Sequence, residues 1–130
     1  MFSIQKAAWQ GIELPELGIG LDLGRSVQPY VFTSHAHADH TPKRNDLNVF
    51  CTAPTLALMR QRGYTGAATV LAFGEWVTLP QARVRLWPAG HILGSAMVEV
   101  QNEAGSLLYT GDYRTPAAPT TEGFAAPEHI

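Results

Sequence analysis

The stretch "TSHAHADHTP" (residues 33–42) places three histidines and an aspartate between His35 and His40, in a chain that has five histidines in all. Neutral imidazole nitrogen and carboxylate oxygen are ligands that suit zinc, manganese and iron, with Zn–N distances near ~2.0–2.1 Å. Cys51 is the only cysteine, so a metal site here must rely on histidine and carboxylate. The cluster therefore predicts a metal site.

The spacing within the cluster predicts two pairs of ligands. On extended backbone alternate side chains project to the same side, so His35 and His37 can reach one ion. Asp39 and His40 are adjacent, and both can face one cavity only if the backbone turns there, which Pro42 favours. We therefore expect these two pairs to serve two neighbouring ions.

Three further polar residues lie where apolar segments end, the place at which α/β proteins gather their sites. His91 lies between glycines in "PAGHILGSA", Asp112 follows "LLYTG", and Asp22 ends "LGIGLD". Asp112 has two carboxylate oxygens and can bridge two cations, whereas Asp22 can accept a hydrogen bond that orients a ligand imidazole. A lone histidine or a lone aspartate after glycine is more often structural, so the interpretation of His91 and Asp112 depends on the cluster.

Apolar segments alternate with glycine and proline along the chain. This pattern predicts strands over 17–24, 29–34, 48–52, 68–73, 76–79 and 82–87, and a hairpin over 96–110. The second arm of the hairpin lacks alternation, as expected of a strand that is covered on both faces.

One helix is clear, over 53–63, with Pro54 in its first turn and Gly63 as its terminator. A second, short helix is expected after Thr41, because threonine is an acceptable N-cap and Pro42 suits the first helical position. Mostly strands with one or two helices indicate an α/β domain.

The composition limits the class of protein. The chain has 130 residues, of which 45% are apolar and 15% charged, as in a single globular domain. The start "MFSIQKAAWQ" lacks the features of a signal peptide, and no stretch approaches the ~18 apolar residues of a membrane span, so we expect a cytoplasmic protein that does not enter a membrane. The net charge of −2 gives no electrostatic indication of a polyanionic partner.

The spacing H-x-H-x-D-H in "SHAHADH" (34–40) resembles the signature of the metallo-β-lactamase fold. Asp22, His91 and Asp112 occur in the order of that superfamily's other motifs. "PAGHILGSA" followed by "YTGDYR" is similar to the nucleic-acid-processing β-CASP branch, in which the corresponding motif reads A-G-H-x-x-G-S. The nearest likeness is to bacterial exonucleases of this fold, of the DNA-ligase-associated and RNA-processing groups, and it covers residues 10 to 115.

The resemblance implies an αββα sandwich, of which this chain matches the N-terminal portion. It also implies two divalent ions, with Zn²⁺ expected and Mn²⁺ as the alternative. The implied ligands are His35, His37 and His91 for the first ion, Asp39 and His40 for the second, and Asp112 for both. Asp22 would support the histidines without binding metal, and Asp39 and Asp112 would be the catalytic carboxylates.

The implied activity is that of a nuclease, expected to be an exonuclease, in which a hydroxide activated between two ions ~3.5–4 Å apart attacks a phosphodiester of DNA or RNA. Asp39 would help to hold the proton of that hydroxide. The implied partners are nucleic acid and the machinery of DNA ligation and repair or of RNA processing. Two alternatives stay open: a small-molecule hydrolase of the same fold, acting on thioesters or lactones, and a non-catalytic fragment that binds metal.

The resemblance also bears on domain organisation. We expect residues 1–130 to form a partial metallo-β-lactamase domain with a loop-like tail over 116–130, and the C-terminal half and the cap domain of the family to be absent. The family supplies a further histidine downstream; His129 would replace it only if the tail folded back. A half domain would expose a sheet face and strand edges.

Overall fold

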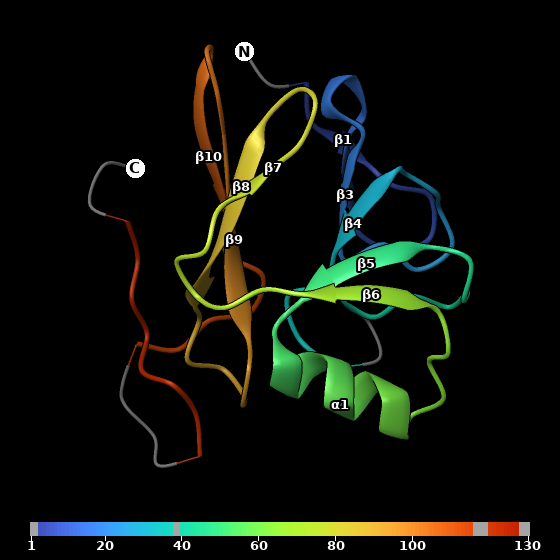
Figure 1. Ribbon diagram of the computed structural model, residues 1–130, viewed down its shortest axis with the longest axis vertical. Coiled ribbons are helices and arrows are strands. Elements are labelled where there is room, and N and C mark those ends of the chain that lie inside the picture. The colour runs from blue at the N-terminus through green and yellow to red at the C-terminus, as the bar shows by residue number, and fades with distance from the viewer. Residues whose placement is uncertain (1–2, 38–39, 116–119, 128–130) are drawn as a thin grey trace.

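The computed structural model describes residues 3–37, 40–115 and 120–127, which form two β-sheets packed face to face with one α-helix against the outside of the first sheet (Figure 1). The first sheet has the order β1 (Gln5–Lys6), β2 (Ile12–Leu14), β3 (Ile19–Leu21), β4 (Tyr30–Phe32), β5 (Asn48–Cys51) and β6 (Ala67–Val70). The second has the order β10 (Gly105–Tyr109), β9 (Ala96–Asn102), β8 (Arg83–Pro88) and β7 (Val77–Thr78). The helices are α1 (Ala53–Gln61) and the 3₁₀ turn η1 (Pro15–Leu17). No helix among these residues is long and apolar enough to cross a membrane.

The first sheet is mixed, and its parallel part positions the polar residues. Strands β3, β4, β5 and β6 run parallel, while β1 and β2 are added in antiparallel pairing. Parallel strands end at one edge of a sheet, where α/β proteins gather their ligands. Asp22 directly follows β3, and the segment that begins at Thr33 follows β4, so both reach the same edge.

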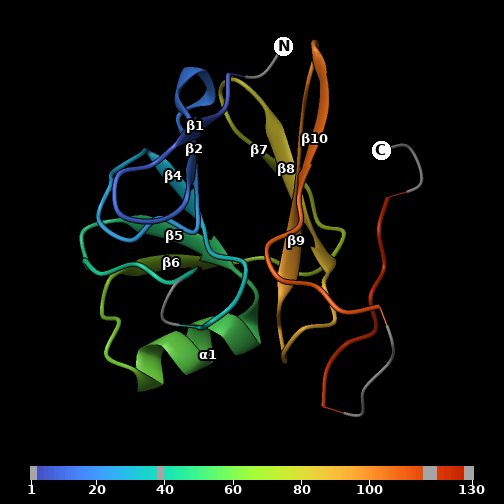
Figure 2. The ribbon, with the colours of Figure 1, turned by 180° about the vertical axis from the view of Figure 1, so that it is seen from behind.

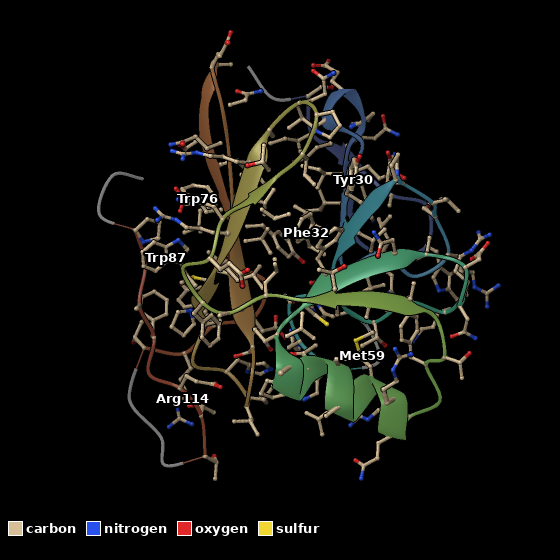
Figure 3. All side chains as sticks on the ribbon, viewed as in Figure 1. Tyr30, Phe32, Met59, Trp76, Trp87 and Arg114 are labelled. Atoms are coloured by element: carbon tan, nitrogen blue, oxygen red, sulfur yellow. The ribbon has the colours of Figure 1, made fainter. Side chains whose placement is uncertain are left out.

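The main core lies between the two sheets. Phe32 is fully buried there and stacks on Phe50 with ring centroids 4.9 Å apart, and Figure 3 shows Phe32 between the sheets. Leu86 and Val98 face it from the second sheet. Because successive side chains of a strand point to opposite faces, Val31 instead joins a smaller core under α1, with Met59.

The outer face of the second sheet is built around one buried carboxylate. Glu99 is fully buried and accepts hydrogen bonds from Arg85 Nε (2.6 Å) and Trp87 Nε1 (2.7 Å). The guanidinium groups of Arg83 and Arg85 lie 3.9 and 4.2 Å from the ring centre of Trp76. Figure 3 shows Trp76 and Trp87 on the side of this sheet away from Phe32. Charge pairing and ring stacking therefore cover this face, and no helix of the described residues lies on it.

The sequence-based fold class is confirmed: the described part of the chain is α/β, with more strand than helix, and contains one α-helix and two sheets. The predicted strands form within the predicted segments or one residue beyond them, and the predicted helix forms over Ala53–Gln61 with Thr52 as N-cap. Strands β1 and β2 were not predicted. They have two and three residues and no alternation of their own, so only the pairing of β1 with β2 and of β2 with β3 defines them.

Two local expectations are wrong. The short helix after Thr41 does not form, and residues 41–47 run through bends to β5. The backbone N–H of Lys43 donates to Gly24 O (2.7 Å), so this segment is bonded to a distant loop and not to its own preceding turn. In the hairpin, the strand covered on both faces is β9, whereas β10 is a half-buried edge strand.

Replacing Phe32 by alanine is expected to lower the free energy of unfolding by about 3–5 kcal/mol, because it removes a buried ring and leaves a cavity. Chemical denaturation measures this loss. Val70, which is 45% exposed, offers a control, and Val70→Ala should change stability by less than about 1 kcal/mol. Equal losses for the two variants would contradict the central position of Phe32.

Candidate metal centre

Polar residues from four separate segments meet at the carboxyl edge of the first sheet. Asp22 follows β3, His35 and His37 follow β4, and His40 comes directly after the two residues of that segment that are not described. His91 lies in the β8–β9 connection, and Asp112 follows β10. In Figure 2 the segment after β4 lies beside the segment after β10, in agreement with the contact between His35 and Asp112.

Four of these residues place their ligand atoms at distances that suit one ion. One ligand atom from each of His35, His37, His91 and Asp112 lies within 4.8 Å of the others. His35 Nε2 and His91 Nε2 are 3.5 and 3.6 Å from Asp112 Oδ2, and His37 Nδ1 is 3.3 Å from His91 Nε2. Two atoms bound at ~2.0–2.1 Å to one tetrahedral ion are about 3.4 Å apart. The spacing and the donor atoms therefore fit a divalent metal.

His40 approaches the same carboxylate from the other side of the cluster. Its Nε2 is 3.6 Å from Asp112 Oδ2, so that oxygen faces three imidazoles. Asp112 is 49% exposed, whereas the His35 side chain is completely buried. Asp39, predicted to act with His40, lies outside the described residues, as does His129. The geometry thus brings together every predicted ligand that it describes.

Asp22 is the buried acceptor that organises this edge. Its Oδ1 accepts the backbone N–H of Ser34 (2.6 Å), and its Oδ2 accepts from Ser34 Oγ, His40 Nδ1 and Tyr109 Oη, each at 2.7 Å. An ionised carboxylate can only accept, so each partner donates. His40 therefore carries its proton on Nδ1, and its Nε2 keeps the lone pair that a metal needs.

Ser34 links Asp22 to His35 and fixes the position of the proton on the His35 ring. Its hydroxyl has one proton, which it gives to Asp22, so it accepts at 2.9 Å from Nδ1–H of His35. The neutral ring then has an unprotonated Nε2, which is buried and has no hydrogen-bond partner among the described residues. An unsatisfied buried lone pair is costly, and a metal ion would satisfy it.

The electrostatics of the cluster keep His35 neutral. Burial, together with the neighbouring imidazoles and His40 above all, lowers the pKa of His35 from 6.5 to about 4, although Asp22 acts in the opposite direction. A histidine ligand must be deprotonated to bind metal. His35 meets this condition throughout the neutral range.

The loop that carries His91 is held by contacts that sequence reasoning did not identify. Ser95 Oγ accepts from the backbone N–H groups of His91 (3.0 Å) and Ile92 (3.2 Å). Gly94 has φ +78°, and a Cβ on it would lie 2.7 Å from Oγ1 of Thr52. Thr52 donates to Gly94 O at 2.7 Å and also caps α1. The spacing of Gly94 and Ser95 after His91 was the available signal.

Comparisons with known proteins agree with this geometry. No protein-family model matches the chain. It is 42% identical over 120 residues to a probable DNA ligase from Opitutus terrae, covering 90% of this chain and 12% of the relative. It is 30% identical over 108 residues to a ribonuclease from Thermus thermophilus, and 28% identical over 103 residues to an RNase J-like protein from Methanocaldococcus jannaschii. Each of these two matches covers 63% of this chain, and 25% and 24% of the relatives.

The chain is partly homologous to β-CASP nucleases of the metallo-β-lactamase fold. It spans a quarter or less of the length of these curated relatives. A crystal structure of a protein of unknown function from Enterococcus faecalis matches with a TM-score of 0.57 and 19% identity, over 72% of this chain and 27% of that one. This likeness shows a shared fold over part of a larger protein.

Asp22→Asn is expected to weaken Zn²⁺ binding by about 10–100-fold, the usual effect of removing a group that orients ligand imidazoles. Asparagine has a similar size and tolerates the positive φ of Asp22 (+55°), so the backbone is preserved. Isothermal titration of the metal-free chain measures the change. Asp46→Asn, at an exposed carboxylate paired with Arg44, is the matched control. Equal affinities for Asp22→Asn and wild type would refute the orienting role.

Protonation of His35 is expected to destabilise the metal-free chain in acid. Because the folded state holds this proton more weakly than the unfolded chain does, stability falls as the pH falls from about 6.5 to about 4. The contribution of this group is about 3 kcal/mol when fully developed. Denaturant unfolding across this range should show a shallower pH dependence for His35→Gln. An unchanged slope would mean that His35 does not carry the effect.

Proposed function

We propose that the chain supplies the N-terminal, metal-binding part of a nuclease that hydrolyses phosphodiester bonds in DNA or RNA. The observation that carries the proposal is the single oxygen of Asp112 that faces Nε2 of His35, His40 and His91 at 3.5–3.6 Å. One carboxylate oxygen that faces three imidazoles suits a site for more than one divalent cation. The partial homology to ribonucleases supports phosphodiesters as the substrate class.

The contacts of the described residues support the ligand assignment that we propose. His35, His37 and His91 would hold one ion, His40 would hold the second together with Asp39, and Asp112 would contact both. Zn²⁺ suits the histidine-rich set, and Mn²⁺ suits the carboxylates. When bound, such ions supply Lewis acidity, charge neutralisation for phosphoryl oxygens, and hydroxide near neutral pH.

The chain's own residues contribute orientation and proton handling. Asp22 fixes the proton of His40 on Nδ1, and Ser34 fixes that of His35 on Nδ1, so both Nε2 atoms face Asp112. We assign Asp39 and Asp112 as the catalytic carboxylates, with Asp39 helping to hold the proton of the attacking hydroxide. The exposed side of Asp112 leaves this edge open to a large substrate.

The biological setting is proposed from the relatives. One relative is a probable DNA ligase, and others are ribonucleases. We propose an exonuclease that acts with DNA ligation and repair or in RNA processing. The second candidate function is metal binding without turnover by this 130-residue chain, and the observation that favours it is the 12–25% coverage of the relatives.

The decisive experiment measures bound metal and turnover on the same preparation. We expect Zn²⁺ or Mn²⁺ to support cleavage of single-stranded DNA or RNA by the chain, and both a chelator and Asp112→Asn to abolish it. A panel of thioesters and lactones is run in parallel. Thioester cleavage without nucleic-acid cleavage would contradict the nuclease proposal, and stoichiometric metal without any turnover would establish the non-catalytic alternative.

A further inference from the structure

Trp9 is an exposed aromatic residue that packing does not explain. It is 67% exposed, the largest fraction among the exposed large apolar residues of the described chain. Its φ of +82° is in the left-handed region, which is a genuine outlier for a bulky side chain. Such conformations cost free energy, and they cluster at binding and active sites. Neither burial nor a relaxed backbone accounts for tryptophan at this position.

Trp9 and Arg25 together form an exposed, positively charged platform. The guanidinium carbon of Arg25 lies 4.3 Å from the ring centre of Trp9. The backbone N–H of Lys43 donates to Gly24 O (2.7 Å), and the guanidinium group of Arg44 donates to Arg25 O (2.9 Å), so the segment after His40 is bonded to the loop that carries Arg25. Asp46 balances Arg44. Arg25 therefore supplies positive charge next to Trp9.

This platform is joined directly to the candidate metal centre. The side-chain amide of Gln10, the next residue after Trp9, donates to the backbone oxygens of Asp22 (3.2 Å) and Thr41 (3.1 Å). Asp22 orients His40, and Thr41 is the residue after His40. Gly24 packs closely here, since a Cβ on it would lie 2.9 Å from Cδ1 of Trp9. The ring is thus held at a set position relative to the ligands.

We propose that Trp9 and Arg25 form a stacking site for a nucleobase of a single-stranded nucleic acid whose phosphate lies at the metal centre. Aromatic faces bind bases of any sequence, and neighbouring cations follow the phosphate backbone. The proposal rests on the proposed function only for the identity of the substrate. It assigns a binding site that contains no metal ligand, so binding can be measured without turnover.

The test is a cycle of two changes, one in the protein and one in the nucleic acid. Fluorescence anisotropy measures binding of a labelled single-stranded oligothymidylate, and of an abasic strand of equal length, to the metal-free chain. Trp9→Ala should weaken binding of the base-containing strand by about 10-fold, the usual effect of losing one stacked base. It should leave binding of the abasic strand unchanged, and Trp9→Phe should retain most of the affinity.

Trp76→Ala is the matched control, because Trp76 also stacks on arginine but lies on the outer face of the second sheet. It should bind both strands as wild type does. If Trp9→Ala does not fold, Trp9→Gly replaces it, since glycine suits the positive φ. Wild type that does not prefer the base-containing strand, or equal losses for both strands in the Trp9 variant, would overturn the proposal.

A separate measurement distinguishes this failure from failure of the proposed function. Hydrolysis of the unlabelled abasic strand, a phosphodiester that has no aromatic ring to stack on Trp9, is measured with added Zn²⁺ or Mn²⁺. Trp9→Ala should cleave this diester as wild type does. No metal-dependent cleavage by either protein would refute the nuclease proposal, whereas cleavage with no effect of Trp9 on strand binding would refute the stacking site alone.

Discussion

The carboxylate of Asp22 is the group on which the arrangement of this molecule depends. It is 1% exposed and accepts hydrogen bonds from a backbone N–H, two hydroxyls and an imidazole. A buried charge is tolerated only when such donors surround it. Because the donors come from the ends of β4 and β10, the same carboxylate that fixes the imidazole tautomers also ties the two sheets together. The packing of the two sheets and the geometry of the candidate site therefore depend on each other.

Much of the fold followed from local patterns. Segments rich in apolar residues between glycine and proline became strands, and the proline and glycine around α1 marked its ends within two residues. The failures have a common cause. Strands β1 and β2, the bends after Thr41 and the covered state of β9 all depend on partners distant in sequence. The spacing of apolar residues and their strand or helix propensity carry no information on which distant segments will pair.

The candidate site shows the same division between local and non-local information. The high density of histidine identified the segment after β4 as a candidate site. His35 and His37, however, lie beyond the end of that strand, on irregular backbone, with ring centroids 4.8 Å apart. Their proximity thus arises from bends and not from strand alternation. From sequence alone, His91 and Asp112 could each have been structural residues. Their short distances to the other histidines identify them as candidate ligands. Ser34 and Tyr109 could not be recognised, because a hydroxyl beside a buried carboxylate has no signature in sequence.

The bond between Tyr109 and Asp22 joins residues 87 positions apart. Contacts of such separation form late, because the entropy of closing a long loop must be overcome before they contribute. Asp112, which follows β10, therefore joins the imidazoles only when the second sheet packs against the first. A chain in which the two sheets have not yet packed would lack this carboxylate beside the imidazoles, so the candidate ligand set is complete only in the folded domain.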